Sequence, residues 1–417
     1  MDAEMSAKLE ALFKTKLHSA MRLYLETCAR CGVCVDSCHA YASVPETKYS
    51  PVGRAEVIRK LFKRYFSMEG KIAPWLGETM KIDDASMEAV YEAAFSCTGC
   101  RRCVTACPFG IDTQMIMGIA KALLIGADKA PMVLSILSDM SIAKGESYTE
   151  TAPAFEEAIR NLEGEVKALW PEPWKPGTPF IPVNVKGADV LYVALSGSHT
   201  MVPAAAIMNA AKENWCLSYF EAVNFGAFLG DAAKAQAIAK RIADEAVRLG
   251  VKEVAIVECG TAFRFFKYMT GDHPFKVSAF VELASRYADE GRIKLRKGTL
   301  PGKTTYHDPC QIARNGGVYE EPRNLVRRLA DEFVELKPNR EDNWCCGGGG
   351  GLISMGELDF RMKSSKVKAE QLRASGAGTM TTACENCHSQ LTDLNEHYGL
   401  GMKTEFISGL VARALVR

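Results

Sequence analysis

The sequence predicts an α+β chain of several domains, in which a helical N-terminal domain precedes an α/β domain. Near the N-terminus, two runs of closely spaced cysteines enclose a long segment with helical patterning. A proline-rich stretch, Trp170 to Pro182, cannot be helix or central strand and indicates a domain boundary. Beyond it, short apolar runs alternate with helical segments, which is typical of parallel α/β layers. We expect domains at 1–145, 188–300 and 301–417, with 146–187 as a proline-rich linker.

Helices dominate the expected N-terminal domain. Residues 5–27 place apolar side chains at helical spacing, with lysine and glutamate on the other side. This apolar face can pack on its own domain or dock on a membrane protein of the same complex, and both interpretations stay open. Further helices are expected at 53–66, 84–95 and 111–125.

Four expected strands, each with neighbouring helices, make up the α/β part. The strands are the short runs 189–195, 253–257, 304–307 and 379–383. The helices are 203–213, 231–249, 321–336, 366–374 and 387–397. Alternating strands and helices favour parallel pairing, but this pattern leaves the order of the strands open.

The two N-terminal cysteine runs have the spacing C-x2-C-x2-C-x3-C. Bacterial-type ferredoxins bind [4Fe–4S] cubanes with this run, and the last cysteine of each run serves the other cluster. Structural zinc or disulfides are the alternatives, but zinc sites use paired C-x2-C units. We therefore expect two cubanes with crossed ligands. One is assigned to Cys28, Cys31, Cys34 and Cys107, and the other to Cys97, Cys100, Cys103 and Cys38.

The composition limits the classes of function. Lys and Arg number 51 against 50 Asp and Glu, so there is no basic footprint for nucleic acid. Many thiols in cluster spacing indicate a reducing, intracellular setting. We expect no secretory signal, because the N-terminus lacks a basic segment followed by an apolar one. No stretch approaches 18 uncharged apolar residues, so we expect no membrane span.

A second group of cysteines lies in the last third of the chain. Its members are Cys310, the adjacent pair Cys345 and Cys346, and the C-x2-C pair Cys384 and Cys387. Five glycines, 347–351, follow the adjacent pair, and their backbone can approach inorganic sulfide closely and donate N–H groups to it. A zinc site or buried free thiols are the alternatives. The adjacent pair favours an irregular iron–sulfur cluster over a cubane.

This arrangement of Cys, Cys-Cys-Gly and C-x2-C resembles the cysteine-rich CCG domain of heterodisulfide reductases. With the two preceding runs, residues 22–400 resemble the family of iron–sulfur proteins formed by the D subunits of heterodisulfide reductases and their GlpC-like relatives. Within this family, the sequence most resembles the DsrK, TmcB and HmcF subunits of transmembrane redox complexes in sulfate reducers. The resemblance implies a pseudo-duplicated α/β CCG domain after the α-helical ferredoxin domain. It also implies a noncubane [4Fe–4S] cluster at the site of disulfide chemistry, held by Cys310, Cys345, Cys346, Cys384 and Cys387.

The first CCG copy, in 188–300, departs from the family pattern. Ser196 falls near the place of Cys310, and Phe220 and Glu221 fall where Cys345 and Cys346 stand. Cys259 matches Cys384, and Ala262 matches Cys387. Cys216 is out of register. We therefore expect one noncubane cluster, in the intact half 301–417.

The resemblance implies the catalytic iron–sulfur subunit of a heterodisulfide-reductase-like complex of anaerobic respiration. Electrons would come from a membrane cytochrome b-type, quinone-reactive subunit or other redox subunits. They would pass through the cubanes to reduce, or in reverse oxidise, a disulfide, a trisulfide or a thiol pair. A small disulfide-carrying protein is one candidate substrate. We expect a cytoplasmic protein, peripheral on the inner face of the cell membrane. The alternative is an electron relay between a soluble dehydrogenase and the quinone pool.

Three polar residues flank the second cysteine group: His307, Asp308 and His388. We expect them to hold the cysteine ligands in place by hydrogen bonds. Donation of a proton to a leaving thiolate is the alternative role.

Overall fold

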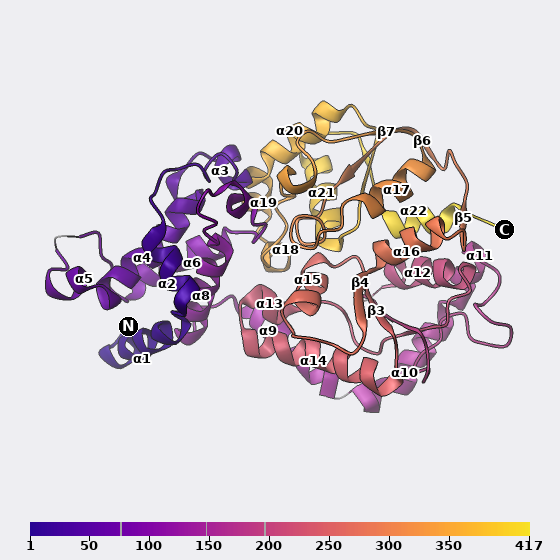
Figure 1. The fold of residues 1–417 in the computed structure, drawn as a ribbon, viewed down its shortest axis with the longest axis horizontal. Coiled ribbons are helices and arrows are strands. Elements are labelled where there is room, and N and C mark those ends of the chain that lie inside the picture. The colour runs from indigo at the N-terminus through magenta and orange to yellow at the C-terminus, as the bar shows by residue number, and fades with distance from the viewer. Residues whose placement is uncertain (76, 147, 196) are drawn as a thin grey trace. The chain divides into compact units, whose positions relative to one another are not determined.

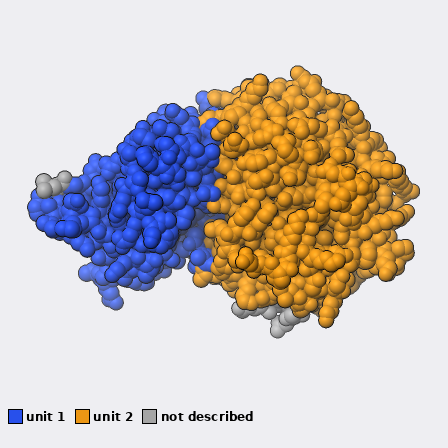
Figure 2. Space-filling view, viewed as in Figure 1, with its two compact units in different colours: residues 1–137, 228–232, 345–368 blue, residues 138–227, 233–344, 369–417 orange. Residues whose placement is uncertain are grey.

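The computed structural model describes residues 1–75, 77–146, 148–195 and 197–417, and these form two compact units (Figure 2). Unit 1 comprises 1–137, 228–232 and 345–368, and unit 2 comprises 138–227, 233–344 and 369–417. The boundary after 137 differs from the expected one after 145. The expected intact CCG half is divided, because 345–368 belongs to unit 1. Ser196 lies outside the described residues.

Unit 1 is helical (Figure 1). It contains α1 (Ala3–Lys16), α2 (Ser19–Thr27), α3 (His39–Ser43), η1 (Thr47–Tyr49), α4 (Pro51–Phe66), α5 (Met68–Ile72), α6 (Asp84–Phe95), α7 (Arg102–Ala106), α8 (Thr113–Gly126), the start of α9 (Met132–Glu146), α18 (Leu352–Met355) and α19 (Leu358–Ser364). Helices α4, α6 and α8 pack on one another and form its core. Their starts follow from local chemistry: Ser50 caps α4 with Pro51 at its first position, and Asp83 shares a capping box with Ser86 at α6.

The expected helix 5–27 is two helices, α1 and α2. Leu17 and His18 leave the helical conformation between them. The apolar face of α1 is buried in unit 1, where α1 packs on α8 and Phe13 meets the Phe66 ring edge to face at 5.3 Å. This packing supports the interpretation in which the apolar face of α1 packs on its own domain. Among the described residues, no helix has the length and apolar character needed to cross a bilayer.

Unit 2 holds two four-stranded parallel sheets (Figure 1). The first has the order β2-β1-β3-β4 and the second β7-β6-β8-β9. Their strands are β1 (Val190–Val193), β2 (Trp215–Leu217), β3 (Glu253–Ile256), β4 (Lys276–Ala279), β6 (Leu300–His307), β7 (Ala330–Val334), β8 (Thr379–Thr382) and β9 (Lys403–Phe406). Each sheet therefore pairs its first strand with its second and third, which confirms the pseudo-duplicated α/β fold. A short antiparallel pair joins β5 (Lys294–Leu295) to β10 (Leu415–Val416).

Helices surround the two sheets of unit 2 in the chain, and some of them pack on one another between the two halves. They are α10 (Tyr148–Asn161), α11 (Glu163–Leu169), α12 (Ser198–Ala210), α13 (Phe225–Leu229), α14 (Ala232–Leu249), α15 (Gly260–Tyr268), α16 (Phe280–Asp289), α17 (Glu320–Leu329), η2 (Arg340–Asp342), α20 (Lys366–Ser375), α21 (Glu385–His397) and α22 (Ile407–Arg413). Helices α12 and α16 of the first half contact α17 and α22 of the second. These contacts join the two halves of the α/β domain.

Two expected segments differ from the structure. The range 146–187 is not a linker throughout, because α10 and α11 occupy 148–161 and 163–169. Only the following proline-rich part lacks helix, since its prolines are concentrated between 171 and 182. The expected helix 321–336 ends at Leu329 and is followed by strand β7.

Candidate metal centres

The two N-terminal cysteine runs fold into loops with the same backbone conformation. In the first run, Arg30 and Gly32 have φ angles of 57° and 83°. The corresponding positions of the second run, Gly99 and Arg101, have φ angles of 68° and 60°. Positive φ is uncommon for residues with a side chain. An arginine in this conformation on each loop therefore indicates a tight turn that the surrounding structure must stabilise. The turn brings successive cysteines of a run to the same side.

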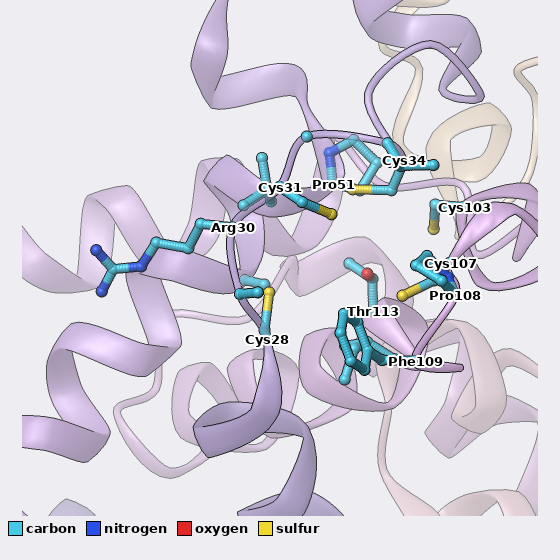
Figure 3. A pocket seen from close by; sticks show the side chains of 16 residues that line it. Cys28, Arg30, Cys31, Cys34, Pro51, Cys103, Cys107, Pro108, Phe109 and Thr113 are labelled. Carbon is cyan, nitrogen blue, oxygen red and sulfur yellow. The ribbon is translucent and has the colours of Figure 1, made fainter.

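The first three cysteines of the first run line a hollow together with Cys103 and Cys107 of the second run (Figure 3). The sulfur atoms of Cys28, Cys31, Cys34 and Cys107 are turned toward this space in Figure 3. A second hollow is lined by Cys97, Cys100, Cys103 and Cys38. Each hollow thus contains three thiols of one run and the last cysteine of the other, and Cys103 of the second run also borders the first hollow. This is the grouping that crossed ligation requires, and the assignment of these thiols as ligands stays a prediction.

In both hollows, burial and neighbouring thiolates disfavour the charged form of at least one cysteine. Burial raises the pKa of Cys34 to about 11, and the thiolates of Cys28 and Cys107 contribute. Burial also raises the pKa of Cys103 well above its ordinary value, together with the other thiols of its hollow. Deprotonating several neighbouring thiols is costly without compensating positive charge. Iron supplies that charge and binds the thiolate form, so the donor sets fit iron–sulfur clusters.

The Cys-Cys-Gly segment is also in unit 1, beside the loop of the second run. The Thr98 hydroxyl lies 3.4 Å from Cys345 Sγ, and either group can donate the hydrogen bond. Gly347 N–H donates to Cys345 Sγ at 3.4 Å, and Gly348 N–H donates to Cys346 Sγ at 3.5 Å. Two of the five glycines therefore donate backbone N–H groups to the adjacent thiols, and donation to inorganic sulfide stays a prediction.

A buried lysine forms hydrogen bonds that hold this glycine segment within unit 1. The Lys121 ammonium donates to the carbonyl of Phe228 at 2.5 Å and to that of Gly350 at 3.2 Å. It also lies 4.6 Å from the centre of the Phe95 ring. Burial lowers the pKa of Lys121 to about 8, while the nearby Cys97 thiolate opposes this shift. The ammonium thus joins α8 to two chain segments that are remote in sequence.

Gly350→Ala should destabilise unit 1 more than Gly356→Ala. Both glycines have nearly equal φ angles, 71° and 74°. Each alanine costs about 1–2 kcal/mol in the left-handed region. A Cβ on Gly350 would lie 2.5 Å from the Cys97 carbonyl oxygen, whereas one on Gly356 meets nothing within 4 Å. Overpacking adds roughly 1–3 kcal/mol. Denaturation midpoints and iron content of the two variants measure the difference, and equal losses would contradict the close packing of the glycine segment.

The other three cysteines of the second group are in unit 2, at the ends of neighbouring strands. Cys310 follows β6, and Cys384 follows β8 at the N-terminus of α21. Because β6 and β8 pair in parallel, both cysteines leave the sheet at the same edge. Cys384 and Cys387 are buried. A hydrogen bond from Cys387 lowers the pKa of Cys384, although burial opposes this shift.

A buried ion network holds the turn before Cys310. The Arg323 guanidinium donates to both carboxylate oxygens of Asp308, at 2.6 and 2.8 Å, and also to Glu335. Burial works against the Arg323 charge, but its bonds to Asp308 and Glu335 raise its pKa. The Asp308 side chain is completely enclosed. Its contacts support the expected positioning role rather than proton donation.

The two flanking histidines have different surroundings. His307 Nδ1 lies 3.1 Å from the Asn343 amide nitrogen, and the same amide donates to the Asp308 carbonyl at 3.0 Å. The His388 ring stacks on Phe406, with centres 4.0 Å apart. Burial lowers the pKa of His388. His388 of α21 thus packs on Phe406 of β9 as a flat aromatic side chain.

The remaining cysteines belong to the first CCG copy. Cys216 is fully buried in β2, and burial raises its pKa to about 12. Cys259 stands at the N-terminus of α15, as Cys384 does at α21. Burial, with a contribution from the Cys384 thiolate, raises the pKa of Cys259 to about 12. The two copies therefore bring these matching cysteines into the same neighbourhood, which the alignment of the copies did not predict.

Two thiol-lined hollows in a helical domain, followed by duplicated α/β layers that carry further cysteines, define an iron–sulfur protein of electron transport. Residues 24–111 match the family model described as a 4Fe-4S dicluster domain, and 304–392 match the cysteine-rich CCG domain. The first match includes all eight cysteines of the two runs, and the second includes all five of the later group.

Three relatives show what the whole chain is similar to. It is 27% identical to the Hdr-like menaquinol oxidoreductase iron-sulfur subunit 2 of Archaeoglobus fulgidus, over 98% of this chain and 83% of that protein. It is 25% identical to the D subunit of the dihydromethanophenazine:CoB--CoM heterodisulfide reductase of Methanosarcina barkeri, over 98% of each chain. It is 22% identical to the EtfAB:quinone oxidoreductase of Syntrophomonas wolfei, over 89% of this chain and 55% of that protein. The chain is therefore a homologue of Hdr-like iron–sulfur subunits and of the D subunits of heterodisulfide reductases.

Proposed function

We propose that this chain is the catalytic iron–sulfur subunit of a heterodisulfide-reductase-like complex that reduces, or in reverse oxidises, a disulfide, a trisulfide or a thiol pair. The observation that carries the proposal is the complete five-cysteine set inside the matched CCG domain. End-to-end similarity to the D subunit of a heterodisulfide reductase supports it. The buried pair Cys384 and Cys387 supplies thiolate ligands at a strand end, where α/β proteins commonly bind their ligands.

The proposed cofactors are two cubanes and one noncubane [4Fe–4S] cluster. The first cubane is held by Cys28, Cys31, Cys34 and Cys107, and the second by Cys97, Cys100, Cys103 and Cys38. The noncubane cluster is held by Cys310, Cys345, Cys346, Cys384 and Cys387. Such clusters supply one-electron transfer, and the protein sets their potentials through charge, hydrogen bonds and exposure. The first CCG copy, with Cys216 and Cys259 enclosed as small core residues, holds none in this proposal.

The proposed electron partner is a quinone-reactive membrane protein of the same complex. Two Archaeoglobus relatives bear the name menaquinol oxidoreductase. We place this chain at the cytoplasmic face of the membrane as a peripheral component, with a small disulfide-carrying protein as one candidate substrate. The Syntrophomonas relative, named as an EtfAB:quinone oxidoreductase, favours a second candidate function. In that case, the chain relays electrons between a soluble dehydrogenase and the quinone pool and performs no sulfur chemistry.

A thiol titration distinguishes the two candidate functions. Adding coenzyme M or dithiothreitol to the oxidised, cluster-loaded chain should produce a new paramagnetic signal, because a substrate thiol binds at the noncubane site. The signals of the two cubanes, recorded after reduction, should stay unchanged and act as the internal control. A chain whose spectrum responds to no thiol or disulfide is a relay.

A further inference from the structure

A buried arginine lies against the thiols of the second hollow. Arg54, only 3% exposed, projects from α4 and donates from Nη1 to Cys38 Sγ at 3.5 Å. Its Nε donates to Ser96 Oγ at 3.0 Å and its Nη2 to the Ser96 carbonyl at 2.8 Å. The guanidinium is therefore fixed in place. Because arginine does not lose its proton in proteins, this is a permanent positive charge beside the hollow.

A buried histidine lies on the side of the same hollow that faces Cys345. A ring nitrogen of His39, Cys100 Sγ and Cys345 Sγ all lie within 4.8 Å of one another. The ring is enclosed, and among the described residues neither of its nitrogens has an ordinary hydrogen-bond partner. In any protonation state at least one nitrogen carries a hydrogen. His39 is thus able to donate to a thiolate of the second hollow or to Cys345.

The first hollow has different surroundings. Its basic residue, Arg30, has a side chain that is 40% exposed. The Arg30 guanidinium is paired with Glu56 at 3.2 Å and with Glu78 at 3.6 Å. Solvent and these carboxylates both reduce the field that it exerts on the nearby thiols. The two hollows therefore offer the same number of proposed cysteine ligands, but the basic side chains beside them differ in burial and in pairing.

We propose that Arg54 and His39 place the reduction potential of the second cubane above that of the first. An electron that a quinol-linked partner delivers would reduce the first cubane and then pass to the second, so that the first is oxidised again as the second is reduced. At the second cubane the electron lies beside Cys345, which is one of the proposed ligands of the noncubane cluster. Arg54 and His39 are positioning residues for electron transfer. The proposal rests on the cluster assignments of the proposed function and adds a direction to them.

Two opposing effects decide the order of the potentials. Reduction adds negative charge, which burial disfavours, so enclosure alone lowers a potential. A fixed positive charge close to the thiolates has the opposite effect. Its attraction is about four times stronger at the effective dielectric constant of a protein site than in water. Hydrogen bonds to ligand sulfur raise the potential further. Arg54 supplies both effects at Cys38, whereas the charge of Arg30 is already shared with carboxylates.

An anaerobic redox titration of the cluster-loaded full chain, followed by electron paramagnetic resonance, tests this order. Nitrogen hyperfine coupling in protein labelled with 15N-histidine should identify the second cubane, because His39 lies against it. That cubane should be reduced first. Arg54→Gln should shift the electron partition between the cubanes toward the first at least tenfold, which is about 59 mV for one electron. His39→Leu should remove the nitrogen coupling and shift the partition in the same direction.

Matched variants separate this effect from damage. Arg54→Lys keeps the charge and should retain most of the potential difference. Arg30→Gln, at the first hollow, should leave the potential of the second cubane unchanged. His18→Leu, on the exposed start of α2, should leave the potentials of both cubanes unchanged. If Arg54→Gln loses iron, the comparison of His39→Leu with His18→Leu decides whether the buried basic groups set the order of the two potentials. Equal potentials in the native chain, or a partition unmoved by Arg54→Gln and His39→Leu, would overturn the proposal. Because no disulfide turnover is measured, the proposed function can fail while this order stands.

Discussion

Cys387→Ala is expected to abolish thiol and disulfide turnover, a loss of several orders of magnitude. Cys387 is 3% exposed in the first turn of α21 and hydrogen-bonds to Cys384. Removing it deletes one proposed ligand and the partner that lowers the pKa of another. The remaining thiols then cannot hold the noncubane cluster, whereas both cubane hollows lie in unit 1 and keep all their cysteines.

Turnover with an artificial reductant and a disulfide, measured beside the reduction of the two cubanes, tests this expectation. Cys216→Ala is the matched control, since it also removes a buried thiol from unit 2 but lies in β2 of the degenerate copy. It should retain turnover. Should the Cys387 variant still pass electrons between its physiological partners at the normal rate, the relay becomes the preferred function.

Arg323→Met is expected to destabilise unit 2 by roughly 3–5 kcal/mol, because it leaves a buried carboxylate without its partner. The Arg323 and Asp308 side chains are both 0% exposed. Asp308 also accepts a hydrogen bond from the Arg340 backbone N–H at 2.9 Å. An unpaired Asp308 carboxylate therefore also disturbs the loop that contains Arg340. Since Asp308 stands two residues before Cys310, we also expect weaker binding of the noncubane cluster.

Arg328→Met provides the control on the same helix. Arg328 pairs with Asp289 at 2.6 Å, but the two side chains are 46% and 50% exposed. Exposed pairs contribute about 0–1 kcal/mol. Chemical denaturation of both variants, together with iron analysis, should show a large loss only at Arg323. Equal denaturation midpoints would mean that the buried network does not stabilise the turn before Cys310.

Local chemistry explains which elements were predictable. The expected helix 84–95 coincides with α6 and 53–66 lies within α4, because capping residues and apolar periodicity act within a few residues. The four apolar runs became the two central strands of each sheet. Strand β7 was missed because only its first residue is buried, so it has the mixed composition of a helix end. The break between α1 and α2 was missed because apolar spacing continues across Leu17 and His18.

The sequence by itself determined which cysteines are the candidate cluster ligands: it contains two ferredoxin-type runs and one CCG set. The runs are recognisable because their ligand loops depend on residues only two or three positions apart. Only the tertiary structure decided which groups surround these thiols. It grouped each run with the last cysteine of the other, and it placed the segment 345–368 with the helical unit. It also set the buried Arg54 against Cys38. Such neighbours are distant in the chain and are selected by packing and burial, which no local pattern records.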